Sequence, residues 1–341
     1  MLMKFFFLLS FGFYRLVLGS NDMLINGAGA TFPYPLYSKW FTEFQKKNPE
    51  IRINYQSIGS GGGIRQLTEA TVDFGASDSP MTDEQLAKSS TPIIHIPTAL
   101  GAVVVTYHPG VSTESLKLTP ELIADLFSGK IKKWEDPRLR AHNPGLKATG
   151  DVFIVHRADG SGTTGIFTDY LSKVNADWKA KVGHGTSVKW PTGIGGKGNE
   201  GVTQLVKQMP GAVGYVELIY AQSNHLPVAD VQNQGGVFVK PSLASVSASA
   251  KELIKAIPED FRVSLTDPPG KAAYPISGFT YLLVHSKAKD AAKGAAFIKF
   301  LEWAVSEGQS YNEALHYSKL PESLVPQVKA KIRTLQSAQV P

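Results

Sequence analysis

The residue types best suited to binding chemistry gather in one short loop at residues 157–165, Arg-Ala-Asp-Gly-Ser-Gly-Thr-Thr-Gly. An apolar run typical of a strand precedes the loop, and a run with helical spacing of apolar residues follows it. A Gly- and Ser/Thr-rich loop between a strand and a helix directs backbone N–H groups towards an anion. Ser161 and Thr163 add hydroxyl donors, and Arg157 adds a planar guanidinium that suits an oxyanion. We therefore predict an anion site here; the alternative is an ordinary turn with a surface ion pair between Arg157 and Asp159.

Other glycine-rich loops have the same context. Residues 27–33 and 57–63 each stand between a run typical of a strand and a run typical of a helix. A further strand-like run ends at residues 77–80, before a short predicted helix. Because ligands of open α/β sheets bind at the carboxyl ends of strands, the Gly/Ser/Thr-rich helix starts could converge on one cleft.

The composition of the 341 residues is that of a soluble globular protein, with 43% hydrophobic and 19% charged residues. Because the sequence contains no cysteine, we expect no disulfide, thiol nucleophile, thiolate zinc site or lipid-anchored cysteine. The net charge of +6 comes from basic residues scattered along the chain, without a basic stripe, zinc-finger spacing or aromatic RNA-binding motif. We therefore expect no nucleic-acid partner.

Residues 1–19 have the pattern of a secretory signal peptide. Lys4 provides a basic start, an apolar core follows it, and small residues end the segment. Cleavage is predicted after Gly19, although Arg15 near the end of the apolar run is atypical. The alternatives are an uncleaved anchor, which would be short for a bilayer span, or a wrongly assigned start. We expect the mature chain to be exported and soluble.

Strand-like runs alternate with helix-like runs along the rest of the chain. This alternation predicts an α/β fold with a mostly parallel sheet that helices cover on both faces. About 320 mature residues are many for one such core, so two α/β domains are predicted. The long apolar, β-branched run at residues 93–107 is typical of strands buried on both faces, or of one strand that crosses between domains.

Motifs that suggest an enzyme lack their necessary context. Residues 193–198 match GxGxxG, but no clear strand precedes them and no Ser or Thr follows Lys197, so nucleotide binding is not predicted. Ser161 and His156 are close in sequence, but the chain has no GxSxG nucleophile elbow. The histidines form no HExxH pattern. We therefore predict no catalytic residues, no cofactor and no metal site.

The chain closely resembles the periplasmic phosphate-binding proteins of bacterial high-affinity phosphate (Pst) ABC transporters. The matching segments occur in the order of that family and span nearly the whole mature chain. They are GAGATFP (27–33), YQSIGSGGG (55–63), VDFGASDSP (72–80), GKIKKWEDP (129–137), RADGSGTT (157–164), VKWPTGIGGKGN (188–199), PGAVGYVE (210–217) and YPIS (274–277).

This resemblance implies the two-domain periplasmic-binding-protein fold of type 2, the Venus-flytrap fold, with crossover hinge strands. Domain I would comprise residues 20–103 and 276–341, domain II would comprise residues 104–275, and the ligand cleft would lie between them. The resemblance also implies a monomeric periplasmic protein that is not an enzyme. It would bind inorganic phosphate and deliver it to the permease subunits and ATPase of an inner-membrane ABC transporter.

Residues of both domains would surround the phosphate if the resemblance holds. They are Thr31, Phe32, Ser60, Asp78, Arg157, Ser161, Gly162 and Thr163, with Asp159 behind Arg157. The chain departs from the family at Gly61, where members often have a second serine, so a hydroxyl contact could be lost. Donors from helix N-termini, hydroxyl groups and one arginine can replace the hydration of a dianion, which is costly to remove.

Asp78 is the most informative residue of this set, because an ionised carboxylate only accepts hydrogen bonds. Monohydrogen phosphate keeps a P–OH donor, whereas sulfate at neutral pH has none. Sulfate would leave Asp78 facing an oxygen lone pair. We therefore expect sulfate to bind at least ~10³-fold more weakly than phosphate. Arsenate carries the same proton as phosphate, so Asp78 would not distinguish arsenate from phosphate. The alternative for Asp78 is a helix N-cap or a turn residue.

Three other functions remain open at the level of the sequence. A secreted phosphatase or phosphotransferase would need a nucleophile–base pair or a metal, which the motifs do not offer. A binding protein for another oxyanion, such as molybdate or sulfate, is disfavoured by Asp78 where that ligand is fully deprotonated. An adhesin or structural extracellular protein would have lost the ligand, and the intact loops argue against it.

Overall fold

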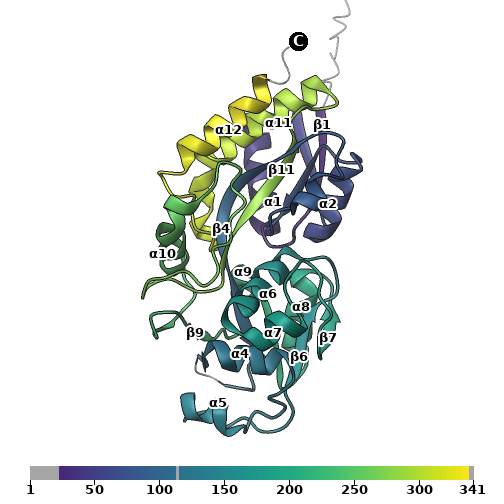
Figure 1. Ribbon diagram of the computed structural model, residues 1–341. Helices are drawn as coiled ribbons and strands as arrows, with labels where there is room; N and C mark the ends of the chain where they lie inside the picture. Colours follow the sequence, from purple (N-terminus) through teal and green to yellow (C-terminus); the bar gives the residue numbers. More distant parts are fainter. Residues whose placement is uncertain (1–22, 113–114, 338–341) are drawn as a thin grey trace, which may run out of the picture.

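The computed structural model describes residues 23–112 and 115–337 of the chain (Figure 1). The predicted signal peptide at residues 1–19 lies outside the described residues. Within the described part of the chain, no helix is long and apolar enough to cross a membrane.

One eight-stranded sheet runs through the molecule in the order β2-β1-β3-β11-β4-β8-β6-β7 (Figure 1). Its strands are β1 (Met23–Gly29), β2 (Ile51–Ser57), β3 (Phe74–Ser77), β4 (Ile93–Tyr107), β6 (Phe153–Arg157), β7 (Ile194–Gly196), β8 (Ala212–Glu217) and β11 (Ser277–His285). A second, three-stranded sheet has the order β10-β9-β5. Its strands are β5 (Lys117–Leu118), β9 (Asp230–Gln232) and β10 (Phe238–Val239).

The two ends of the large sheet are parallel, as predicted. β1 pairs in parallel with β2 and β3, and β6 pairs in parallel with β7 and β8. In the centre, β11 is antiparallel to β3 and β4, and β4 is antiparallel to β8. The prediction of a mostly parallel sheet is therefore wrong for the centre. A strand buried on both faces has the same continuous apolar pattern in either direction, so its direction cannot be read from periodicity.

Helices pack around this sheet, and several of them start at a side-chain cap. They are α1 (Tyr34–Lys47), α2 (Ser60–Thr68), α3 (Asp83–Leu86), α4 (Pro120–Phe127), α5 (Pro137–His142), α6 (Gly162–Val174), α7 (Ala176–Lys181), α8 (Gly198–Gln208), α9 (Leu218–Ser223), α10 (Leu243–Leu253), α11 (Ala291–Ala304) and α12 (Val325–Ser337). Short 3₁₀ turns occupy Ile254–Ala256, Glu307–Tyr311 and Glu313–Leu315. At α4, the Thr119 hydroxyl accepts a hydrogen bond from Leu122 N, and Pro120 takes the first helical position, where a missing N–H has little effect.

Figure 1 shows two lobes with β4 passing from one to the other. We call β1–β3, β11, α1, α2, α11 and α12 the first lobe, and β6–β8 with α4–α8 the second lobe. β4 pairs with β11 from Ile93 to Ala102 and with β8 from Val103 to Tyr107. The apolar run at residues 93–107 is therefore one continuous strand that is shared by both lobes.

The segment between β10 and β11 contacts both lobes. Near the start of α10, Leu243 O accepts a hydrogen bond from Ser318 Oγ at 3.0 Å, and α10 lies towards the first lobe in Figure 1. Further along, Thr266 Oγ1 accepts a hydrogen bond from Lys173 Nζ of α6 at 2.8 Å. The division of the chain into residues 20–103 with 276–341 and residues 104–275 stays a prediction.

Each lobe has its own aromatic core. In the first lobe, the rings of Phe74 and Phe297 stack with their centroids 4.5 Å apart. In the second lobe, Phe167 and Tyr215 stack at 4.4 Å. Burying a side chain of this size is worth about 1.5–3 kcal/mol. The second core also positions the predicted anion loop, because the buried Tyr215 hydroxyl accepts a hydrogen bond from Arg157 N at 3.2 Å.

Candidate functional site

The loop at residues 157–165 connects β6 to α6, as predicted from its sequence. β6 ends at Arg157, and Ser161 is the N-cap of α6. The Ser161 hydroxyl accepts a hydrogen bond from Thr164 N at 3.0 Å, which satisfies one free N–H of the first helical turn. The strand, loop and helix start that suit an anion are therefore present in the second lobe.

Three strands of the first lobe deliver the other predicted residues. Thr31 and Phe32 follow β1, Ser60 is the first residue of α2 after β2, and Asp78 follows β3. β1 pairs in parallel with both β2 and β3, so the carboxyl ends of the three strands lie at the same edge. All four side chains are buried.

The loops of the two lobes touch directly. Gly162 N donates a hydrogen bond to Ser60 Oγ at 3.0 Å, and Gly61 N donates to Gly160 O at 2.9 Å. A Cβ atom on Gly162 would lie 2.5 Å from Ser60 Oγ and 2.6 Å from Asp78 Oδ2, so only glycine fits there. The structure brings the predicted residues of both lobes to one place; their role as ligands stays a prediction.

The buried Arg157 and the partly buried Asp159 form an ion pair within the second-lobe loop. Arg157 Nε donates to Asp159 Oδ1 at 2.8 Å, and Arg157 Nη2 donates to Asp159 Oδ2. Gly198 N also donates to Asp159 Oδ1, at 2.9 Å. Burial alone would raise the pKa of Asp159, but the guanidinium and the Gly198 N–H lower it below its usual value. Asp159 is therefore ionised, and it holds the guanidinium in place while tempering its charge.

Serine hydroxyl groups of the site are oriented by N–H donors of the protein. Ser60 Oγ accepts hydrogen bonds from Gly162 N at 3.0 Å and from Asp78 N at 3.3 Å. Ser161 Oγ accepts from Thr164 N, as described above. A hydroxyl has two lone pairs and a single hydrogen, so that occupied lone pairs leave the hydrogen to be donated. In this structure the Ser60 hydrogen points to Asp78 Oδ2 at 3.5 Å, and Ser161 Oγ keeps its own hydrogen and a lone pair. Either hydroxyl can turn its hydrogen towards an anion that enters the site.

Asp78 contributes a carboxyl group among these donors. Its Oδ1 accepts a hydrogen bond from Thr280 Oγ1 at 2.8 Å, and its Oδ2 lies 3.5 Å from Ser60 Oγ. Burial raises the pKa of Asp78 to about 7, although the Thr280 hydroxyl and the charge of Arg157 act to lower it. The N-cap of α3 is Thr82, so Asp78 is not a helix cap. When ionised, this carboxylate can accept a further hydrogen bond from a ligand.

Sequence reasoning missed three residues that support the site. Thr280 lies within an apolar run of β11 that is typical of a buried strand, so no local pattern marks it. Tyr317 donates a hydrogen bond to Phe32 O at 2.6 Å, from a segment far along the chain. Asn199 lies in the GKGN segment that resembles the family, and this was the sequence signal for it.

The departure from the family at Gly61 has a structural counterpart. A Cβ atom on Gly61 would lie 3.1 Å from the Cα atom of Gly160 in the opposite lobe. A serine at this position would therefore require the two loops to separate by a few tenths of an ångström. Glycine at position 61 therefore allows the close backbone contact with Gly160, and it lacks the hydroxyl group that a serine would provide.

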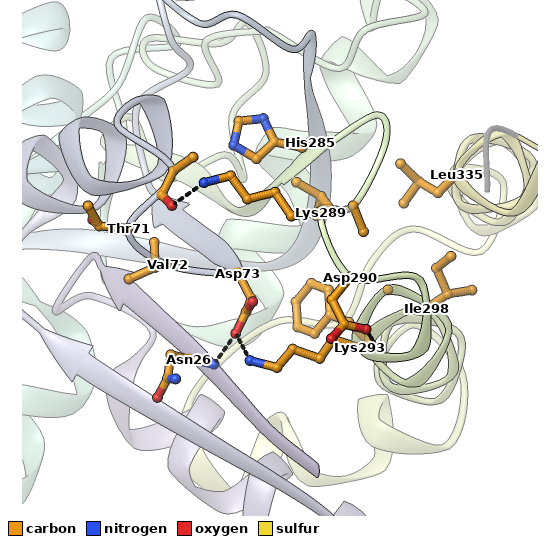
Figure 2. Close-up of a pocket in the computed structure, with 15 residues that line it drawn as sticks. Asn26, Thr71, Val72, Asp73, His285, Lys289, Asp290, Lys293, Ile298 and Leu335 are labelled. Atoms are coloured by element: carbon orange, nitrogen blue, oxygen red, sulfur yellow. Dashed lines mark hydrogen bonds and ion pairs between the residues drawn. The ribbon is translucent and has the colours of Figure 1, made fainter.

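A separate pocket lies on the first lobe, away from these loops (Figure 2). Lys293 Nζ lies 3.5 Å from Asp73 Oδ2, which also accepts a hydrogen bond from Asn26 N at 2.7 Å. Lys289 Nζ donates to Ala70 O at 3.0 Å. Because both lysines of the pocket already have partners, we assign it no ligand.

Comparison with known proteins decides the family. A family model described as a PBP superfamily domain matches residues 18–307. The phosphate-binding protein PstS of Xylella fastidiosa (strain 9a5c) is 46% identical over 313 residues, which cover 91% of this chain and 85% of that protein. The chain belongs to the PstS family. The PstS of Pasteurella multocida (strain Pm70) is 42% identical to this PstS chain, with 96% and 95% of the two chains covered.

Solved structures agree with this family's fold. A high-affinity periplasmic phosphate-binding protein, PfluDING, with phosphate bound matches the PstS chain with a TM-score of 0.71 at 22% identity, covering 90% of this chain and 93% of that one. A phosphate-binding protein from Stenotrophomonas maltophilia matches with a TM-score of 0.69 at 21% identity, covering 91% and 94%. The predicted two-domain periplasmic-binding-protein fold is therefore confirmed.

Proposed function

We propose that this PstS protein binds inorganic phosphate between its lobes and delivers it to an ABC transporter for import. Relatives that match over most of the chain carry the name phosphate-binding protein, and a solved protein of the same fold has phosphate bound. The residues of the site supply an independent chemical reason.

The observation that carries the proposal is a cluster of donors around one carboxylate. The Ser60 and Thr280 hydroxyls donate to Asp78 and the Arg157 guanidinium lies near it, whereas ionised Asp78 only accepts. A ligand that satisfies both sides must have several acceptor oxygens and one remaining hydrogen. Monohydrogen phosphate has both, and its hydrogen can be donated to Asp78.

We further propose the set of residues that contact phosphate. They are Thr31, Phe32, Ser60, Asp78, Arg157, Ser161, Gly162 and Thr163, with Asp159 holding Arg157. The proposed domains, residues 20–103 with 276–341 and residues 104–275, would close around the ligand by bending near β4, because both lobes contribute to the set. The direct contacts between the loops of the two lobes support this closure.

The cellular setting follows from the family. We propose a periplasmic monomer that is exported by residues 1–19 and works with the inner-membrane permease subunits and their ATPase. We propose no catalytic role, because the sequence motifs offer no nucleophile–base pair and no metal site. Release of phosphate from p-nitrophenyl phosphate by the purified chain would contradict this part of the proposal.

Calorimetric titration of the purified chain, residues 20–341, tests the proposal. We expect one phosphate per chain with a dissociation constant on the order of micromolar or tighter. A matched titration with chloride controls for ionic strength, which screens weak charge attraction. A chain that takes up no phosphate under these conditions contradicts the proposed function.

A further inference from the structure

Asn199 lies fully buried at the start of α8, between the two lobes. Its Oδ1 accepts a hydrogen bond from Glu217 N at 3.0 Å, and a backbone N–H requires an acceptor at that position. The two hydrogens of Nδ2 must therefore point the other way. They are donated to Thr31 Oγ1 at 2.8 Å and to Thr163 Oγ1 at 3.2 Å.

These contacts fix the direction of two hydroxyl groups from opposite lobes. Thr31 Oγ1 also accepts a hydrogen bond from Asn199 N at 3.2 Å, so both of its lone pairs are occupied. Thr163 Oγ1 accepts from Asn199 and lies 3.4 Å from Arg157 Nη1, which is a second donor. Each hydroxyl keeps only its hydrogen to offer, and this hydrogen is available to a ligand.

The anchor of Asn199 lies where the sheet passes between the lobes. Glu217 is the last residue of β8 and pairs with Val103, where β4 changes its partner from β11 to β8. One side chain of the second lobe thus joins the end of β8 to the Thr31 loop of the first lobe. The contact with Thr31 can form only when the lobes approach each other.

We propose that Asn199 is a positioning residue that turns the hydroxyl hydrogens of Thr31 and Thr163 towards the phosphate when the lobes close. This inference rests on the proposed function, because it assigns the two threonines as donors to the anion. It predicts that the donor hydrogens of Asn199, rather than its volume, set the phosphate affinity.

The variant Asn199→Asp separates these two properties, because it keeps the shape and replaces two N–H donors by an acceptor. At about pH 8 we expect its dissociation constant for phosphate to rise at least ~30-fold. On acidification, the ratio of variant to native dissociation constants should fall, because a protonated carboxyl regains an O–H donor. If Asn199→Asp only loosened the packing, the ratio of the two dissociation constants would not fall on acidification.

Asn143→Asp is the matched control. Asn143 is also buried in the second lobe; its Oδ1 accepts from Lys117 N at 2.8 Å, and its Nδ2 donates to Lys117 O and Leu139 O. It is the C-cap of α5, and α5 lies at the end of the second lobe that is farthest from the first lobe (Figure 1). We expect Asn143→Asp to lower the melting temperature comparably and to change the phosphate dissociation constant less than ~3-fold.

A double-mutant cycle with Thr31→Val and Asn199→Ala tests whether Asn199 acts through the threonine. We expect the combined loss of affinity to be much smaller than the product of the two single losses. Losses that multiply, or an Asn199→Asp protein that is folded and binds phosphate as the native chain does, overturn the inference and leave the proposed function intact. A native chain that does not bind phosphate overturns both.

Discussion

Asp78 has the least favourable surroundings among the residues of the site. Its carboxyl group is buried between the lobes, receives one close hydrogen bond from Thr280 and has a pKa raised to about 7 by burial. The nearest guanidinium, on Arg157, is already paired with Asp159. Ser60 Oγ donates to the other carboxyl oxygen only at 3.5 Å, so a ligand that brings its own hydrogen would give Asp78 a closer donor. The unfavourable environment is therefore consistent with a role in recognition.

Replacing Asp78 by asparagine should weaken phosphate binding and relax the discrimination against sulfate. The amide can donate to a bare oxygen, whereas the ionised carboxylate cannot. We expect a ~10–100-fold weaker phosphate affinity and an improved ratio of sulfate to phosphate affinity, measured by competition calorimetry at about pH 8. Asp73→Asn, in the pocket of Figure 2, is the control and should change neither value. An unchanged ratio in Asp78→Asn would count against the assigned role.

Asp78 should also make the closed form of the protein, without ligand, less stable as the pH rises. Its folded-state pKa of about 7 lies above the usual value, so between about pH 4 and 7 the folded state binds more protons than the unfolded state. The free energy of unfolding therefore decreases with pH across this window, by roughly 2–4 kcal/mol. Asp78→Asn should remove this decrease and should raise the melting temperature at about pH 8 relative to the native chain.

The measurement is thermal unfolding of both proteins at about pH 4.5 and 8, in a buffer without phosphate. The relevant quantity is the difference between the Asp78→Asn and native melting temperatures at each pH, because groups remote from Asp78 titrate alike in both proteins. A difference that is the same at both pH values would show that Asp78 is not destabilising in the ionised form.

At the scale of elements, close contact between helix starts of opposite lobes defines the site. α2 and α6 face each other, and Ser60 of one meets Gly162 of the other. Gly61, the second residue of α2, and Gly160, in the loop before α6, are the matching pair of small residues. Glycine at these positions lets N–H groups of the two lobes approach a shared ligand.

A side chain on Gly162 should therefore prevent closure. The Cβ atom of Gly162→Ala would meet Ser60 and Asp78 at 2.5–2.6 Å, so the lobes must stay apart. We expect at least ~100-fold weaker phosphate binding with an unchanged far-UV circular dichroism spectrum. Gly61→Ala is the graded control, because its Cβ atom would lie at 3.1 Å from Gly160 and the loss should be smaller. Equal affinity of Gly162→Ala and native protein would exclude closure at this contact.

The sequence predicted those elements whose signals are local. Gly/Ser/Thr-rich stretches after apolar runs located the loops that hold Thr31, Ser60 and Arg157, and the family resemblance connected them. Local signals could not locate Thr280, because its β11 strand reaches Asp78 from 202 residues further along the chain. The orientation of the Asn199 amide depends on Glu217, a contact made by tertiary structure alone. The antiparallel centre of the sheet was missed for the same reason.

At the scale of the whole molecule, two lobes with separate aromatic cores share one continuous strand. β4 hydrogen-bonds to β11 along its first part and to β8 along its last part. Each lobe can therefore keep its packing while the angle between the lobes changes, which is the requirement for hinge closure. Burial of the ligand between the lobes would remove water and strengthen each hydrogen bond to it.

Selective binding of phosphate depends most directly on recognition of the ligand's hydrogen by Asp78. The decisive measurement is a competition titration of the native chain with phosphate and sulfate at about pH 8, where Asp78 is mostly ionised. We predict that sulfate binds at least ~10³-fold more weakly than phosphate, because it offers Asp78 no donor. Sulfate affinity within tenfold of that for phosphate would contradict the account.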